Sequence, residues 1–111
     1  LVLMVEPNHA AVLNDYAWLL RHSPDRLTDA LDMAKQSVAL VPTASHAWDT
    51  LAEIQYRLGQ YQEALESTER TLALTDDTLP RTVARRELLL AKIRAGSADG
   101  EGSKSKQPGQ E

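Results

Sequence analysis

The chain contains no cysteine, which excludes disulfide bonds, thiolate metal ligands and cysteine nucleophiles. It also contains no phenylalanine and only two tryptophans and three tyrosines. Aliphatic residues and alanine must therefore supply most of the hydrophobic core. No stretch approaches the roughly 18 consecutive apolar residues that a membrane-spanning helix requires. The 111 residues are 42% hydrophobic and 25% charged, which is typical of a globular chain of one domain or less.

The charge is unevenly distributed along the chain. Residues 1–78 carry 5 basic and 12 acidic side chains, a net charge of −7, whereas residues 79–95 carry a net charge of +4. Proteins that bind duplex nucleic acid obtain much of their affinity from lysine and arginine on phosphates, so the acidic body argues against such a partner. We expect the basic segment to dock onto the acidic body.

No motif for catalysis or metal binding is present. The three histidines, His9, His22 and His46, lie far apart and lack the i, i+4 pairing of zinc ligands. There is no G-x-S-x-G sequence, no phosphate-binding glycine loop and no H-E-x-x-H sequence. The sequence therefore predicts a protein that is not an enzyme and needs no cofactor or metal.

Three glutamates, Glu63, Glu66 and Glu69, share one side of a predicted helix at three-residue steps. Such a cluster resembles an acid–base or metal site. A solvated face is the simpler interpretation, because polar outer faces are the default for amphipathic helices. We expect these carboxylates to face Arg81 or Arg85, each exposed pair contributing less than about 1 kcal/mol.

Apolar residues recur at three- and four-residue steps, which is the helical period, and no segment alternates as a strand would. We expect Gly59 to end one helix, because glycine readily takes the left-handed conformation that follows a helix. We expect Pro42 to end another, because a proline disfavours helical geometry at the residue before it. Asn8, Thr43 and Asp77 or Thr78 are the predicted N-caps. The spacing predicts helices near 9–22, 26–41, 44–58, 61–75 and 79–95.

One pattern occurs twice in the chain. Leu13-x-x-Tyr16-Ala17-x-x-Leu20 recurs 35 residues later as Trp48-x-x-Leu51-Ala52-x-x-Gln55. A second pattern, which begins Leu27-x-x-Ala30, recurs after 34 residues as Tyr61-x-x-Ala64. A period near 34 indicates an array of helical repeats, and stacked repeats form extended grooves suited to binding.

The second copy of the pattern resembles a tetratricopeptide repeat. The residues that match the family pattern are Trp48, Leu51, Ala52, Gly59, Tyr61 and Ala64. Gln55, Thr68 and Thr71 depart from it. The resemblance covers about residues 7–76. It implies an all-α fold in which antiparallel helical hairpins stack as an α-solenoid.

On this basis we divide the chain into five parts. Residues 1–7 are expected to be the end of a truncated preceding helix, and residues 8–42 and 43–77 to be two repeat units. A C-terminal capping helix is expected at 78–95, with Leu79, Val83, Leu90 and Ile93 on its apolar stripe and Arg86 as an exception. Residues 96–111 hold one apolar side chain, so we expect a disordered tail.

In the family that this chain resembles, the first helix of each hairpin lines a concave groove. The resemblance therefore implies a protein or peptide partner bound in that groove. Asp49 and Glu53 would repel a carboxylate, which favours a neutral or basic partner. The positions at which one family variant clamps acidic chaperone tails hold no basic residue, being Asn14, Trp18, Thr50, Pro80 and Ala84. The expected groove residues are Asn14, Trp18, Arg21, His22, His46, Asp49, Glu53, Tyr56 and Arg57.

Two other functions remain open from the sequence. The chain is also compatible with a substrate-recruiting or regulatory repeat arm of a larger enzyme, and with a scaffold that self-associates through the open end of the array. Trp18 is either an interface anchor or packed against an upstream helix. Nothing in the sequence indicates a compartment, so the cytoplasm is only a default.

Overall fold

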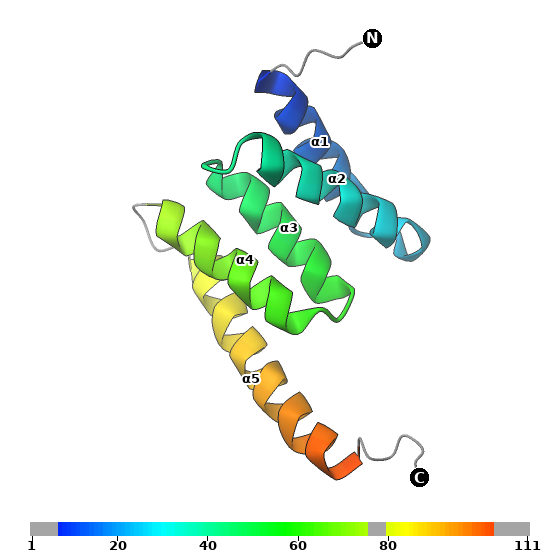
Figure 1. The fold of residues 1–111 in the computed structure, drawn as a ribbon, viewed down its shortest axis with the longest axis vertical. Coiled ribbons are helices and arrows are strands. Elements are labelled where there is room, and N and C mark those ends of the chain that lie inside the picture. The colour runs from blue at the N-terminus through cyan, green and yellow to red at the C-terminus, as the bar shows by residue number, and fades with distance from the viewer. Residues whose placement is uncertain (1–6, 76–79, 104–111) are drawn as a thin grey trace.

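The computed structural model describes residues 7–75 and 80–103 of the chain. These residues form five α-helices: α1 (Pro7–Leu20), α2 (Leu27–Leu40), α3 (Ser45–Arg57), α4 (Tyr61–Leu74) and α5 (Pro80–Ser103). A short 3-10 turn, Pro24–Arg26, precedes α2. Each helix packs against the next one along the chain, and α1 also contacts α3. The described residues contain no strand, and the helices stack as antiparallel pairs (Figure 1). The predicted all-α, repeat-like stack that ends in a helix is confirmed.

Alanines lie where the helices of the stack approach closely. Ala17, Ala30, Ala52 and Ala64 are all fully buried. Larger side chains fill the space beside them, and Trp48 packs half-buried against the core. Its indole Nε1 donates a hydrogen bond of 2.8 Å to the Pro42 carbonyl. The alternation of small and large residues in the sequence thus becomes close helix packing.

Polar side chains are buried between α3 and the following helix. Ser67 donates a hydrogen bond of 2.7 Å to the Gln55 Oε1 atom, and Thr71 donates one of 3.0 Å to the Ser67 carbonyl. Thr68 is also fully buried. The residues that depart from the repeat pattern, Gln55, Thr68 and Thr71, therefore lie together in the core. Their hydrogen bonds offset the cost of burying polar groups.

The turn between α3 and α4 depends on Gly59, which has a φ of +82°. Its N–H donates to the Tyr56 carbonyl and the N–H of Gln60 donates to the Gln55 carbonyl. These two bonds form a Schellman motif, in which the residue after the helix takes the left-handed conformation that glycine adopts most readily. The predicted end of this helix at Gly59 is confirmed.

Several predicted boundaries are wrong. Pro7 begins α1 instead of ending an earlier element, because its fixed φ and missing N–H suit the first position of a helix. Asn8 therefore lies within α1, and Ala44, not Thr43, precedes α3. At the other end, α5 continues through residues 96–103, where we expected a tail. Extending a formed helix adds one hydrogen bond per residue, and no proline interrupts this segment. The expectations for residues 1–6 and 104–111, the predicted N-cap at Asp77 or Thr78, and the stripe residue Leu79 lie outside the described residues.

The buried face of α5 also differs from the predicted stripe. Thr82, Arg85 and Leu89 are buried, whereas Val83 and Leu90 are only half-buried. On this face Arg85 donates a hydrogen bond to the hydroxyl of Thr68, which is buried on α4. The apolar stripe of α5 was predicted one residue away from the face that is buried. The spacing of apolar residues cannot identify an interface that is partly polar.

Candidate functional site

The residues expected to line the groove fall into two groups, and α1 supplies the first. Asn14 is buried, and its Oδ1 atom has no hydrogen-bond partner among the described residues. Trp18 is half-buried beneath Arg21, whose guanidinium carbon lies 3.7 Å from the centre of the indole ring. Arg21 also donates a hydrogen bond of 2.7 Å to the Trp18 carbonyl. His22 is exposed in the turn after α1. This group offers a stacked tryptophan–arginine pair.

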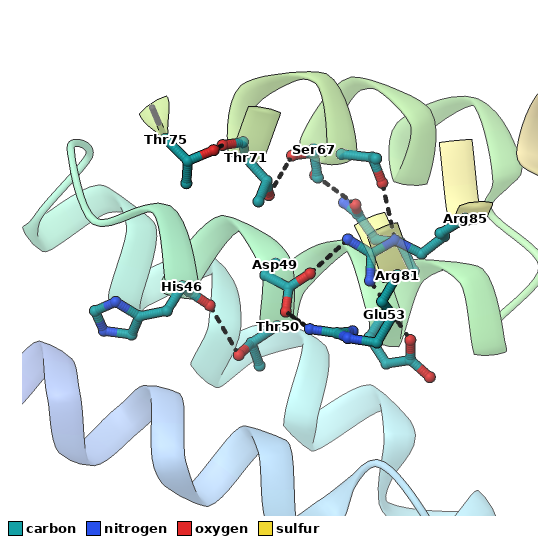
Figure 2. A network of polar contacts seen from close by, with 11 residues as sticks. His46, Asp49, Thr50, Glu53, Ser67, Thr71, Thr75, Arg81 and Arg85 are labelled. Carbon is teal, nitrogen blue, oxygen red and sulfur yellow. Dashed lines mark hydrogen bonds and ion pairs between the residues drawn. The ribbon is translucent and has the colours of Figure 1, made fainter. Parts of the chain in front are cut away.

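The second group lies on α3, where two carboxylates point toward α5. The Asp49 carboxylate accepts hydrogen bonds of 2.8 Å from Arg81 and 2.6 Å from Arg85 (Figure 2). Glu53 accepts one of 2.7 Å from Arg57 and lies 3.7 Å from Arg85. Because Asp49 and Glu53 are already paired with arginines, they no longer give a reason to expect a basic partner.

Two further members of this group lie at the ends of α3. His46 is exposed, and its backbone carbonyl accepts a hydrogen bond of 3.1 Å from Thr50. Tyr56 is half-buried, with its ring 5.9 Å from that of Tyr61. The Lys92 ammonium lies 6.0 Å from the Tyr56 ring and 5.5 Å from the Tyr61 ring. This lysine brings α5 to the same edge of the molecule.

Arg85 is the central cation of this region. It is only 7% exposed, and besides its bond to Asp49 it donates a hydrogen bond of 3.1 Å to the Thr68 hydroxyl. Burial by itself would raise the pKa of the Asp49 carboxyl. The hydrogen bonds and positive charges of Arg81 and Arg85 outweigh burial, so this pKa lies below its ordinary value of 3.8. Asp49 is therefore a carboxylate at neutral pH.

The basic segment docks on the acidic body, as the charge distribution predicted, but through other partners. Arg86 donates a hydrogen bond of 2.8 Å to Glu69, whereas Arg81 and Arg85 pair with residues of α3. The expectation that Arg81 or Arg85 would face the glutamates of α4 is therefore wrong. The rotation of α5 about its axis decides these pairs, and the sequence alone did not fix that rotation.

A hollow of about 240 Å³ lies between α3 and α5. It is smaller than the roughly 300–1,000 Å³ of sites for drug-sized molecules. It exceeds the cavity of about 150 Å³ that holds benzene in an engineered protein core. Its size therefore suits one large side chain of a partner. The residues that line it are Glu53, Tyr56, Arg81, Ala84, Arg85 and Leu88.

Only Glu53 and Tyr56 of the nine expected groove residues line this hollow, with Asp49 and Arg57 paired beside it. The α1 residues and His46 lie outside the lining. The α5 side chains were missed, because α5 was interpreted only as a cap. If α5 had been treated as the first helix of a third hairpin, the residues 35 positions after His46, Asp49 and Glu53 would have been included, which are Arg81, Ala84 and Leu88.

Two further features of the described residues concern other kinds of site. Within the described part of the chain, none of the helices combines the length and apolar character needed to cross a membrane. Across residues 7–75 and 80–103, no cluster of three or more histidine, aspartate or glutamate side chains is arranged to hold a metal ion.

Comparison with known proteins identifies one segment of the chain. The family model for the tetratricopeptide repeat matches residues 45–78. No curated protein and no solved structure matches the chain. The matched segment contains α3 and α4, and thus the Gly59 turn and one wall of the hollow. Residues 45–78 are a tetratricopeptide repeat, which implies protein partners and is typically non-catalytic.

Proposed function

We propose that this chain is a non-catalytic interaction module that binds a peptide or partner helix along the face shared by α3 and α5. The hollow between these helices is the observation that carries the proposal. The repeat identity of residues 45–78 supports a protein partner, and the size of the hollow supports an anchor of one side chain.

The lining of the hollow indicates the chemistry of that anchor. Tyr56, Ala84 and Leu88 provide apolar surface, and Leu88 is 45% exposed. Arg81 and Glu53 provide charged groups beside it. Apolar surface beside charged groups is a common combination around an interface hot spot. A large apolar side chain of the partner would therefore enter the hollow.

The charges around the hollow indicate whether the partner should itself be charged. Asp49 and Glu53 are balanced by Arg57, Arg81 and Arg85, so no carboxylate there is left without a cation. We therefore propose a neutral anchor, and we drop the preference for a basic partner that rested on these two carboxylates. Trp18 and its stacked Arg21 would contact a partner that extends along α1.

The test uses a displayed library of random peptides selected against the 111-residue chain. Selected peptides should share a large apolar residue, and Leu88→Glu should weaken their binding at least tenfold. Leu74→Glu is the matched control, because Leu74 is similarly exposed at 39% but lies on α4 outside the hollow. Binding should be measured by calorimetry, with circular dichroism to verify that both variants fold.

Two results would overturn the proposal. One is a set of peptides whose affinity is unchanged by Leu88→Glu. The other is binding that survives the simultaneous replacement of Trp18, Glu53 and Arg57 together with Leu88→Glu. A Trp18→Ala variant would separate the contribution of α1, since it leaves the hollow intact.

A further inference from the structure

Cations outnumber carboxylates around the hollow between α3 and α5. Asp49 and Glu53 supply two negative charges, and Arg57, Arg81 and Arg85 supply three positive charges beside them. Each of the two carboxylates already lies within ion-pair distance of two arginines. The local charge is therefore positive, although the chain as a whole carries a net charge of −4.

Arg81 holds an accessible part of this positive charge. It lines the hollow, and its side chain is 60% exposed. Its hydrogen bond to Asp49 within the described residues uses only the Nη2 atom (Figure 2). A guanidinium carries five N–H donors in a rigid fork, so Nε and Nη1 can still donate to a carboxylate of a partner. Arg85, in contrast, is 6% exposed and is held by groups inside the protein.

Lys92 supplies a further cation at the same edge of the molecule. Its ammonium lies near the rings of Tyr56 and Tyr61, and Tyr56 lines the hollow. No carboxylate among residues 7–75 and 80–96 forms an ion pair with this ammonium. Lys92 is half-buried, so part of its side chain faces solvent. Its charge is therefore available to a carboxylate of a partner.

Arg81 and Lys92 lie at the two ends of the hollow along α5. The contacts of Asp49 with Arg81 and of Tyr56 with Lys92 show that α3 and α5 run in the same direction. Eleven residue steps separate the two cations, which is about 16 Å along a helix. Leu88, the last residue of α5 in the lining, lies between them. A segment bound along α5 would therefore pass one cation, then the hollow, then the other cation.

We propose that the partner segment carries acidic side chains on both sides of its apolar anchor, one paired with Arg81 and the other with Lys92. This inference rests on the proposed function, because it specifies the partner of the same hollow. An extended segment spans 16 Å in about five residues, and a helix spans it in about eleven. The two carboxylates are therefore expected within about five residues of the anchor.

These ion pairs would determine selectivity more than affinity. Exposed pairs are weak in water, so each should lower the Kd only about two- to fivefold. Charges more than about 10 Å away are screened at 0.1 M salt, so the net negative charge of the chain opposes an acidic segment only weakly. A basic segment would instead bring its charges against Arg81 and Lys92 and be repelled.

The first experiment uses the peptides selected against the 111-residue chain, resynthesised with an acetylated N-terminus and an amidated C-terminus so that only side chains supply carboxylates. We expect aspartate or glutamate to be enriched on both sides of the anchor. The Kd from calorimetry should rise several-fold between about 50 and about 500 mM sodium chloride. Peptides with neutral flanks and a salt-independent Kd would overturn this inference, while sensitivity to Leu88→Glu would leave the proposed function in place. Insensitivity to Leu88→Glu would overturn both.

The second experiment reverses one charge. Lys92→Glu should weaken the acidic peptides about two- to fivefold, and replacing the peptide acid on that side by lysine should restore the affinity. Lys35→Glu is the matched control, because Lys35 is exposed on α2, outside the lining, and should leave the Kd unchanged. Circular dichroism verifies that both variants fold. Equal weakening by the two substitutions, or no restoration by the lysine peptide, would overturn the inference.

Discussion

At the scale of single residues, Arg85 is the clearest example of a charged side chain with a structural role. Its side chain is 6% exposed and binds partners on two helices, Asp49 of α3 and Thr68 of α4. Among the residues that the structure describes, the Nη1 atom of Arg85 and the hydroxyl of Thr82 are buried without a hydrogen-bond partner. A buried pair of this kind fixes the position of α5 without adding much net stability. Its removal, however, is costly.

We predict that Arg85→Met lowers the free energy of unfolding by about 3 kcal/mol, because it removes one of the two arginines that pair with the Asp49 carboxylate and the hydrogen-bond donor to the buried Thr68 hydroxyl. Arg26→Met is the matched control, since Arg26 and Asp29 form a pair whose side chains are 48% and 58% exposed. Such exposed pairs contribute less than about 1 kcal/mol. Urea unfolding of both variants measures the difference. Equal losses would contradict a structural role for Arg85.

The lowered pKa of Asp49 gives a second prediction. A carboxyl group whose pKa is lower in the folded state stabilises the fold above its unfolded-state pKa. That contribution is lost as the pH falls through the folded value. Stability should therefore fall on acidification below about pH 4, and Asp49→Asn should fall less steeply. Urea midpoints measured between neutral and acidic pH test this, with Asp15→Asn as an exposed control. A parallel decline in all three proteins would reject it.

At the scale of elements, α4 and α5 show which part of the packing could not be predicted from the sequence. Alanines at helical spacing were correctly expected in the core, because they permit close approach in any packed helix pair. The burial of Thr82 and Arg85 on α5, and the hydrogen bond from Arg85 to Thr68 of α4, were not predicted. They depend on the rotation of α5 about its axis, and an apolar period carries no information about that rotation.

The turn after α3 provides a prediction about a single element boundary. Gly59→Ala should destabilise the protein by about 1–2 kcal/mol, because a side chain disfavours the left-handed conformation. A Cβ atom at Gly59 would meet no other atom within 4 Å, so the cost belongs to the backbone alone. Urea unfolding measures this loss.

Gly96→Ala is the matched control for that substitution. Gly96 also has open space for a Cβ atom but lies inside α5. Alanine is favoured over glycine in a helix by up to about 1 kcal/mol, so circular dichroism should detect equal or greater helicity. Destabilisation by both substitutions to the same extent would mean that conformation at Gly59 is not the cause.

At the scale of the whole molecule, the repeat period was the feature of the sequence from which most of the fold could be predicted. The approximate positions of α1 to α4 and their stacking order followed from two copies of one pattern. The candidate site was predicted less well from the sequence. It joins α3, a helix of the repeat, to α5, which lacks the repeat signature. Glu53 and Tyr56 were found because they lie on α3, whereas Ala84 and Leu88 were not.

The stack also predicts how stability is distributed along it. In repeat architectures each unit is stabilised mainly by its neighbours. Among the described helices, α3 contacts α1, α2 and α4, and it contains the fully buried Ala52 and Ile54. Its amides should therefore exchange most slowly, with α2 and α4 intermediate and α1 and α5 fastest. Hydrogen exchange by mass spectrometry in dilute solution measures this order. Uniform protection of all five helices in dilute solution would show that the chain unfolds as one cooperative unit, contrary to the expectation for stacked repeats.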